Sequence, residues 1–496
     1  MKKLFTLILL ILFTIINAQN TTLNISESAE YKDKEKAIDV LTIHTTENGL
    51  TGIVRESKHD ILFDVFDNDL NKTHNLVVKS DKKERYIGEV VYGDEIKVFT
   101  VFSPKAKERL VYCHTFNIKS GSHNKKKLFE ATVAKKRFLF GNRKDRQTSI
   151  DISPNGKYLA MATDNIYKDV NDYAIRVFDA TTLEHIYTKS YQKHEEKYFQ
   201  HNDISINDDG VVFVLGKLYE NGKKEKKKGE ANYSFILNKI TEKANEEISI
   251  SLDDQHIRNL RISIVDNKLH LIGFYSEKRT GKIKGGCNFI IDSDIFSVAS
   301  KNNYELPLDV YEDLYGDKKG SRKKEKGKEL TNFYIDYVLK DSQGNTYLLA
   351  EEFYITQTYV STGMNNGYWQ TVYHYDDILI FKFGASGNLD WGRSIFKRSN
   401  SPSYNAFLKD DELHVLLNSG KNLLEKDDGR TKVSKGWFES SSLYDIVYNS
   451  TGEVIYSKIQ DNKGKTYYQP FYGTYQDGKF IMMSSGRKKR QFMILQ

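Results

Sequence analysis

Residues 153–164, SPNGKYLAMATD, and residues 173–184, YAIRVFDATTLE, decide how this chain folds. Pro154-Asn155-Gly156 is a turn signal, and the apolar stretch that follows it has the length and composition of a β-strand. A second strand of the same kind follows in YAIRVFD and ends at another polar turn. This unit of turn, strand, loop and strand recurs along the chain.

The same unit begins at seven further turns, each followed by a short apolar stretch. They are Glu47-Asn48-Gly49 before LTGIV, Gly93-Asp94 before EIKVFTVF, Asp208-Asp209-Gly210 before VVFVLG, Asp266-Asn267 before KLHLIGF, Ser342-Gln343-Gly344 before NTYLLAE, Asp410-Asp411 before ELHVLL and Asp477-Gly478 before KFIMM. Each unit has another strand before its turn, and most have a fourth strand after a further polar turn. Four short strands repeated in this way are typical of a β-propeller.

We therefore predict an all-β fold, a single β-propeller with eight blades of four antiparallel strands. Seven blades are the alternative if the irregular first unit is not a separate blade, and two or three unrelated β-sandwiches are a further alternative. The last unit lacks its fourth strand because the sequence stops at Gln496. Residues 21–26 (TTLNIS) are expected to supply that strand and to close the ring, which removes exposed sheet edges.

Composition agrees with one β-rich unit. The 496 residues include only 5 Pro, and no Pro-rich or Gly/Ser-rich stretch separates two folding units. Hydrophobic residues make up 39% of the chain, which excludes a disordered protein, and the aromatic residues include 32 Tyr and 27 Phe. Aromatic side chains suit the pleated surface of a sheet. Residues 19–496 are thus expected to form one propeller domain.

The N-terminus has the pattern of a secretory signal peptide, which we place at residues 1–18. Lys2 and Lys3 give the charged start, an apolar stretch follows, and Ala18 is the small residue before the expected cut. An uncleaved membrane anchor is the alternative. No later stretch is apolar enough to span a membrane. The expected location is the periplasm, the cell surface or the medium.

The two cysteines, Cys113 and Cys287, are too few for a disulfide framework. They fall on the third strands of the second and fifth units. Three blades of separation is much further than a disulfide can span, so both are expected to be free thiols.

Two segments also resemble known propellers. The segments 153–164 and 173–184 resemble the repeat of TolB-like and WD40-like propellers. The segment YLLAEEFY…YHYDDILIFKFGASGNLDWGRSIFK (347–397) is similar to exported β-propeller proteins of Bacteroidota whose roles are uncharacterised. These resemblances imply the propeller fold and export, and they bring no catalytic residues.

Sequence motifs for catalysis are absent. The chain has no Walker loop, no HExxH zinc motif, no GxSxG nucleophile elbow and no complete EF-hand loop. We therefore assign no catalytic residue and expect no cofactor and no metal site. The acidic pairs Glu351-Glu352 and Asp376-Asp377 are expected to lie on the surface at turns and strand ends. Adjacent strand residues point to opposite faces, so each pair can supply at most one inward carboxylate.

Charge is expected to differ between the two faces of the disc. The loops between second and third strands, and the connections between blades, lie on one face. They hold about 48 Lys and Arg against about 28 Asp and Glu. The richest stretches are 135–146, 223–228, 318–328 and 487–490. Such a face attracts an acidic polymer; the alternative is that its lysines are only solvated. The candidate ligand-binding lysines are Lys223, Lys224, Lys226, Lys323 and Lys324.

One loop of this face is different, since residues 353–376 (FYITQTYVSTGMNNGYWQTVYHYD) contain no Lys or Arg. Asn365-Asn366-Gly367 is a hairpin turn signal, so we predict a protruding two-stranded ribbon. Its aromatic residues suit stacking on a sugar or contact with a protein. Alternatively, they pack on the long loops 306–330 and 418–442. The candidate ligand-binding residues here are Tyr359, Tyr368, Trp369 and Tyr373.

Two functions follow from these features. The first is an exported, non-enzymatic propeller that binds a ligand or protein, with an acidic polymer, a glycan or another envelope protein as partner. Nucleic acid is a less favoured ligand. The second is an enzyme that acts on a polysaccharide at the central channel. Three or more carboxylate or His side chains converging on the channel would favour the enzyme.

Overall fold

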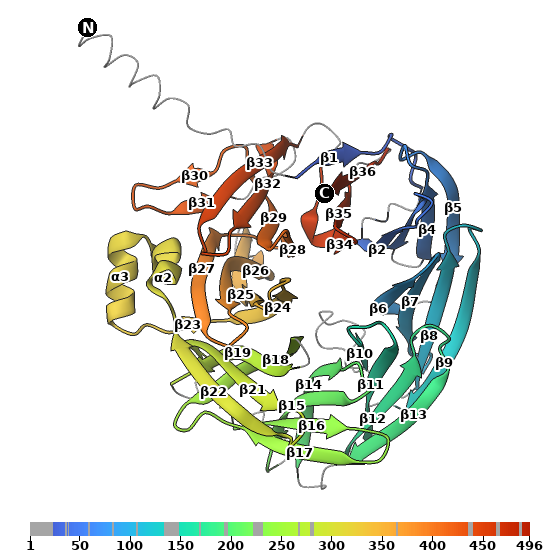
Figure 1. Cartoon of the computed structure of the whole chain (residues 1–496). Coiled ribbons are helices and arrows are strands. Elements are labelled where there is room, and N and C mark those ends of the chain that lie inside the picture. Colours follow the sequence, from blue (N-terminus) through green and yellow to red (C-terminus); the bar gives the residue numbers. More distant parts are fainter. Residues whose placement is uncertain are drawn as a thin grey trace.

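Seven four-stranded antiparallel sheets and one six-stranded sheet, whose first four strands are antiparallel, form a ring of eight blades in the computed structural model of the chain (Figure 1). The predicted eight-bladed β-propeller is thereby confirmed. The structure describes residues 23–34, 37, 39–57, 60–81, 84–105, 108–132, 148–167, 170–192, 197–221, 232–265, 268–277, 282–363, 366–434, 440–462, 467–485 and 489–496. The predicted signal peptide lies outside them.

The blades follow one another along the chain, each running from the innermost to the outermost strand. Blades 1 to 4 are β2 (Asp39–Thr45), β3 (Thr51–Glu56), β4 (Asp60–Phe66) and β5 (Lys72–Lys79); β6 (Arg85–Tyr92), β7 (Glu95–Phe102), β8 (Glu108–Asn117) and β9 (His123–Thr132); β10 (Thr148–Ile152), β11 (Tyr158–Tyr167), β12 (Val170–Asp179) and β13 (His185–Gln192); and β14 (Tyr198–Ile206), β15 (Val212–Tyr219), β16 (Ser234–Ile240) and β17 (Asn245–Ile250).

Blades 5 to 8 continue in the same order. They are β18 (His256–Val265), β19 (Lys268–Ser276), β21 (Gly285–Asp292) and β22 (Ser297–Glu305); β24 (Phe333–Lys340), β25 (Thr346–Gly363), β26 (Asn366–Phe383) and β27 (Leu389–Lys397); β28 (Tyr404–Lys409), β29 (Glu412–Gly420), β32 (Ser441–Tyr448) and β33 (Val454–Asp461); and β34 (Thr474–Gln476), β35 (Lys479–Met483), β36 (Phe492–Leu495) and β1 (Ile25–Glu27).

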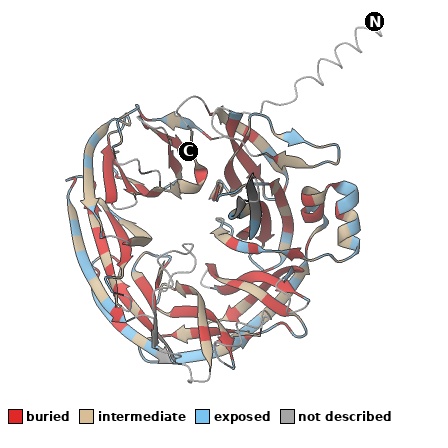
Figure 2. Cartoon of the chain, turned by 180° about the vertical axis from the view of Figure 1, so that it is seen from behind, coloured by how far each residue is buried: buried red, intermediate tan, exposed pale blue. Residues whose placement is uncertain are grey.

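The first strands of neighbouring blades contact one another around the centre, and the fourth strands lie at the rim. The second and third strands carry most of the buried residues, whereas rim strands such as β9 and β17 are largely exposed (Figure 2). Most hydrophobic clusters lie between adjacent blades. One of them joins Ile175 and Val177 of blade 3 to Phe199 and Val214 of blade 4. Packing of one blade on the next therefore supplies the core.

Tight turns of the predicted type connect the first and second strands. Asp410 and Asp411, between β28 and β29, have φ angles of 52° and 61°. Two consecutive residues with positive φ are typical of the hairpin turn that matches the twist of the strands, and Asp tolerates this conformation. The polar turns that reveal the repeat in the sequence are thus required by backbone geometry.

The ring is joined by the two ends of the described chain. In blade 8, β1 pairs antiparallel with β36, and Ile25 lies opposite Leu495. The backbone N–H of Asn24 also donates to the carbonyl of Gln496 at 2.6 Å. The pairing includes residues 25 and 26 of the segment 21–26 and extends to Glu27.

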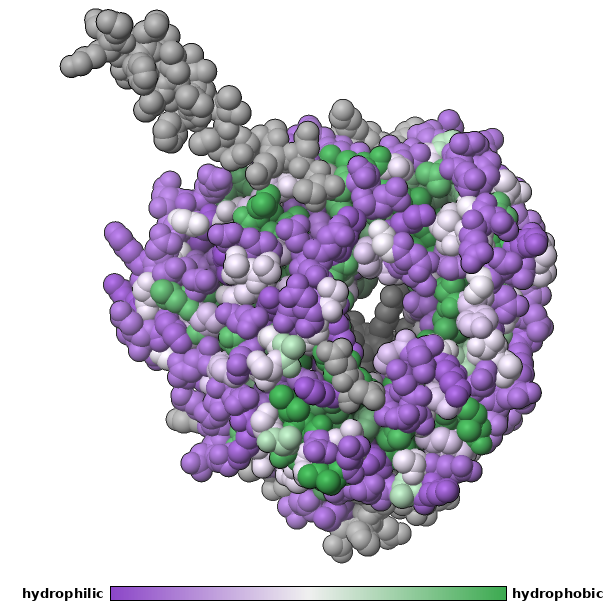
Figure 3. All heavy atoms as spheres, in the orientation of Figure 1, coloured by the Kyte–Doolittle hydropathy of each residue, from purple (hydrophilic) through white to green (hydrophobic). Residues whose placement is uncertain are grey.

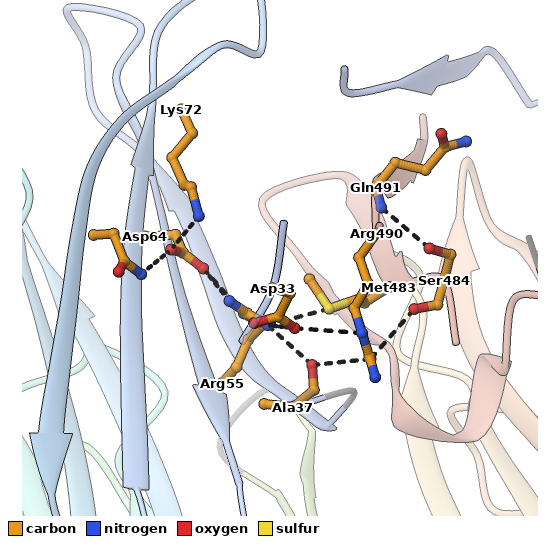
Figure 4. A network of polar contacts seen from close by, with 10 residues as sticks. Asp33, Ala37, Arg55, Asp64, Lys72, Met483, Ser484, Arg490 and Gln491 are labelled. Atoms are coloured by element: carbon orange, nitrogen blue, oxygen red, sulfur yellow. Dashed lines mark hydrogen bonds and ion pairs between the residues drawn. The ribbon is translucent and has the colours of Figure 1, made fainter. Parts of the chain in front are cut away.

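A buried polar network fastens the segment after β1 to blades 1 and 8 (Figure 4). The Arg55 side chain is fully buried, and its Nε donates to Oδ2 of Asp64 at 3.0 Å. Its Nη1 donates to Asp33 at 3.1 Å, and Asp33 also pairs with Nε of Arg490 at 3.4 Å. Asp33 therefore joins one arginine from blade 1 to another from blade 8. Arg490, which the sequence placed in a basic surface stretch, is in fact buried.

Both cysteines are free thiols, as predicted. Cys113 lies on β8 and Cys287 on β21, the third strands of blades 2 and 5, and both are buried. Burial raises the pKa of Cys113 to about 11 and the pKa of Cys287 as well.

Two segments expected to be loops contain regular structure instead. Residues 306–330 include α2 (Leu308–Tyr315), α3 (Asp317–Glu325) and β23 (Leu330–Thr331), which pairs with β20 (Lys282–Ile283). Residues 418–442 include β30 (Leu424–Glu425) and β31 (Thr431–Val433), and β31 extends the blade 6 sheet by pairing with β27. These additions lie at the outer edge of blade 6 (Figure 1). In the described part of the chain, neither helix has the length and apolarity needed to cross a membrane.

Candidate functional site

The predicted ribbon is present on blade 6, where β25 and β26 are each 18 residues long. Their pairing continues to Gly363 and Asn366, far past the points where β24 and β27 end against them. Residues 353–363 and 366–375, here called the ribbon, thus form a two-stranded extension of the blade. Figure 1 places β25 and β26 beside the central opening.

One face of the ribbon is aromatic. Phe353 lies opposite Tyr375, and Ile355 lies opposite Tyr373; residues directly opposite each other share a face. Trp369 belongs to the same alternation as Tyr373 and Tyr375. Trp369 is 67% exposed and Tyr373 is 49% exposed, so a large part of each ring is open to solvent.

The other two predicted ribbon residues are placed by register alone. Tyr359 pairs with Trp369, and Tyr368 pairs with Val360. Their side chains lie outside the described part of the structure.

The second face of the ribbon is polar. The Tyr354 and His374 rings stack with centroids 4.4 Å apart, and Thr356 Oγ1 lies 2.8 Å from Nε2 of His374. The Tyr354 hydroxyl donates to Oδ2 of Asp376 at 2.8 Å. These contacts fix the lower part of the ribbon against its base.

The aromatic face continues into a cavity of about 870 Å³ in the channel. Tyr375 forms part of its wall, together with the inner strands β24, β28 and β34 of blades 6 to 8. Its aromatic lining residues are Tyr337, Tyr375, Tyr404, Phe407, Phe471, Tyr472 and Tyr475. The Phe407 and Tyr475 rings stack at 4.5 Å. The disc is open at its centre, and the face shown in Figure 3 is mostly hydrophilic.

Three carboxylates line this cavity: Asp39, Asp336 and Glu351. Asp336 accepts a hydrogen bond from the Tyr404 hydroxyl at 3.0 Å. Glu351 forms an ion pair with Nζ of Lys397 at 2.8 Å. No group of three or more His, Cys, Asp or Glu side chains in the described ranges is placed to hold a metal ion.

The acidic pairs at the ribbon base are mostly buried, so the expectation that they are surface acids is wrong. Glu351, Asp376 and Asp377 are 6%, 2% and 6% exposed. Asp377 pairs with Arg398 and accepts from the backbone N–H of Lys397 at 3.1 Å. The basic partners of these acids, Lys397 and Arg398, come from the end of β27. The sequence around the acidic pairs gives no sign of these distant partners. Glu351 lines the cavity and Glu352 does not, as strand alternation predicted.

Burial dominates the titration of two of these acids. Burial, with the neighbouring charge of Asp377, raises the pKa of Glu352 to about 7. Burial also raises the pKa of Asp377 to about 6, despite the opposing effect of Arg398. Protonation at the ribbon base is thus sensitive to pH near neutrality.

Of the candidate lysines, the two that the structure describes are not brought together with the ribbon. Lys223, Lys224 and Lys226 lie outside the described residues. Lys323 and Lys324 are on α3 at the outer edge of blade 6, so this stretch is not a mobile loop. Lys324 pairs with Glu305 at 3.0 Å, and Nζ of Lys323 lies 4.3 Å from the centre of the Tyr315 ring.

Other described cations of the same face are also paired with carboxylates, and the sequence offered no signal for this. The pairs are Lys284 with Glu277, Lys397 with Glu351, Arg398 with Asp377, Arg430 with Asp428, Lys489 with Glu30 and Arg490 with Asp33. Several described cations of the basic face are therefore balanced by its own acids.

No protein-family model matches the chain, and no curated protein matches it. Solved propellers do match over most of its length. The β-propeller domain of the Trilobed protease from Pyrococcus furiosus is 10% identical, with a TM-score of 0.40 and coverage of 87% of this chain and 98% of that one. The Dos1 propeller is 7% identical, with a TM-score of 0.44 and coverage of 95% and 94%. The polysaccharide lyase Uly1 is 10% identical, with a TM-score of 0.41 and coverage of 95% and 99%.

Proposed function

We propose that the protein is an exported propeller that binds a glycan chain through the ribbon and the channel cavity. The observation that carries the proposal is the row of Trp369, Tyr373 and Tyr375 on one ribbon face, which leads into an aromatic cavity. Sugar rings present a face of C–H groups that packs on aromatic rings, while their hydroxyls reach polar groups nearby. Export is supported by the pattern of residues 1–18.

The spacing of this row favours a chain-like ligand. Successive residues on one face of a strand are separated by about 7 Å, so Tyr375 and Tyr373 are neighbours and Trp369 is about two such steps further on. A compact ligand would touch one of these rings, whereas a chain can touch all three. Two of these rings are about half or more exposed. They stand on a paired ribbon, so a ligand that binds them has little conformational freedom of the protein to restrict.

Aromatic contact is favoured over binding of an acidic polymer as the source of affinity. The described cations nearest the ribbon, Lys397 and Arg398, are held by Glu351 and Asp377. An acidic polymer would have to displace these carboxylates. The three carboxylates of the cavity, Asp39, Asp336 and Glu351, reach the number that we set for an enzyme, so catalysis at the channel is the second candidate function. Binding is placed first because the exposed aromatic row lies on the ribbon, outside the cavity that holds these carboxylates.

The test is a glycan array with the mature protein and matched variants. Trp369→Ala and Tyr373→Ala are expected to weaken binding of any glycan that the parent binds by about tenfold or more each, as for central aromatic contacts. Tyr92→Ala is the control, because Tyr92 is 56% exposed and lies at the turn between β6 and β7, on the opposite face.

Equal binding by all four proteins would refute the proposal. Release of new reducing ends from a bound glycan would replace it with catalysis at the channel.

A further inference from the structure

A second pocket, of about 310 Å³, lies beside the channel cavity. Pro402 and Phe471 line both spaces, so they are neighbours. The pocket lies where blades 6, 7 and 8 meet on the ribbon side. Its walls come from the connection between β27 and β28, from Asn418 at the end of β29, and from the chain just before β34. Its volume is at the lower end of the range for small-molecule sites.

The lining is rich in uncharged polar side chains. Asn400, Ser403 and Gln469 line the pocket, and no described protein group forms a hydrogen bond with their side chains. Tyr467 and Phe471 add aromatic surface beside them. Asn400 is exposed and Ser403 and Gln469 are half-buried, so a ligand can reach them; amides and hydroxyls next to aromatic rings suit a ligand that has both hydroxyl groups and C–H faces.

The charged groups in the wall are balanced from within the protein. Lys397 is 1% exposed and pairs with Glu351, and its Nζ also donates to the carbonyl of Tyr375. Arg398 pairs with Asp377 and lies 3.7 Å from Asp376. Three carboxylates, those of Glu351, Asp376 and Asp377, thus lie against the two cations Lys397 and Arg398. These two cations line the pocket while their carboxylate partners lie behind them, so a negatively charged ligand would find both cations already compensated and gain little from them.

From this pocket we infer that the glycan of the proposed function is a neutral one, and that one of its sugar units occupies the pocket while the rest of the chain crosses the cavity to the ribbon. The inference rests on the proposed function and adds to it a second compartment and the chemical class of the ligand. The sugar hydroxyls would pair with Asn400, Ser403 and Gln469, and Phe471 would contact both compartments.

The charge of the ligand is tested with hexasaccharides that share a backbone. Neutral hexasaccharides of mannose, glucose and galactose are compared with the corresponding hexauronates by calorimetric titration of the mature protein. At least one neutral hexasaccharide is expected to bind, and its uronate counterpart is expected to bind at least tenfold more weakly. The affinity for the neutral hexasaccharide is expected to stay constant between about 50 and 200 mM salt. Tighter binding of the uronates, with an affinity that falls as salt rises, would overturn the inference.

The pocket is tested with the double variant Asn400→Ala, Gln469→Ala. Loss of two hydrogen bonds is expected to weaken binding of the neutral hexasaccharide roughly five- to tenfold. The control is Asn302→Ala on β22, the rim strand of blade 5. An unchanged affinity in the double variant together with a loss in Trp369→Ala would refute the pocket and leave the proposed function standing. Absence of any binding to the panel by the parent would overturn both.

Discussion

The most quantitative prediction concerns Asp33, the single carboxylate that joins the arginines of blades 1 and 8. Its side chain is 4% exposed, and Asp33→Asn removes the charge with little change in shape. Arg55 would keep Asp64, but among the described residues the Arg490 side chain would keep only the carbonyls of Ala37 and Ser484 within hydrogen-bond reach. A buried cation that loses its counter-ion costs about 3–5 kcal/mol, and we expect a loss of this size in the free energy of unfolding.

The measurement is equilibrium unfolding in urea, with the free energy taken from the midpoint and the slope. The matched control is Asp253→Asn, which removes a carboxylate from an ion pair with Lys301 where the Asp253 side chain is 82% exposed. An exposed pair of this kind contributes little, so the control is expected to unfold like the parent. If both variants lost the same small amount of stability, the network of Figure 4 would not hold the ring closed.

Three further predictions concern titration, thiols and lysines. Because the pKa of Glu352 is raised from 4.5 to about 7, the unfolded chain loses this proton at lower pH than the folded protein, so the stability of the parent falls between about pH 4.5 and pH 7 and is constant above; Glu352→Gln should therefore be more stable than the parent at pH 8 and close to it at pH 4, and a thermal-melting difference that is the same at both pH values would contradict this. Cys113 and Cys287 should react with a thiol reagent only after unfolding, and rapid labelling of the native protein would show that they are not buried. Replacement of the lysine run by Gln should leave the affinity for a neutral hexasaccharide unchanged, and a loss of affinity would return the lysines to the site: Lys223, Lys224, Lys226, Lys227 and Lys228.

The strand plan of the fold was predictable because it depends on local chemistry. A turn such as Asp410-Asp411 needs positive φ, and only a few residue types accept it at low cost, so the turn leaves a mark in the sequence. The ribbon was predictable for the same reason, from the turn signal Asn365-Asn366-Gly367 between two stretches rich in aromatic residues.

Features that depend on contacts between distant segments were not predictable. α2 and α3 form where a charged stretch was expected to be a loop, because α2 buries Val310 and Leu314 and its Asp313 pairs with Arg393 of β27. The partners of Glu351 and Asp377 likewise come from the end of β27. No spacing within either segment indicates these contacts.

The candidate site was predictable only in part. Trp369 and Tyr373 were found from composition, and the structure places both on an exposed ribbon face. The cavity and the adjacent pocket were missed because their walls come from the inner strands and connections of three blades. Residues such as Phe471 and Gln469 have no distinctive local pattern, and only the ring geometry brings them together.

The central claim, that a glycan lies on the aromatic face of the ribbon, is tested most directly by the solvent access of Trp369. The chain has three Trp residues, and the Trp369 side chain is 67% exposed, whereas Trp391 is buried. Acrylamide quenching of fluorescence is measured with and without a saturating neutral hexasaccharide, in the parent and in Trp369→Phe. We predict that the glycan reduces quenching in the parent and that this reduction is absent in the variant. Quenching of the parent that is unchanged by a bound glycan would contradict the claim.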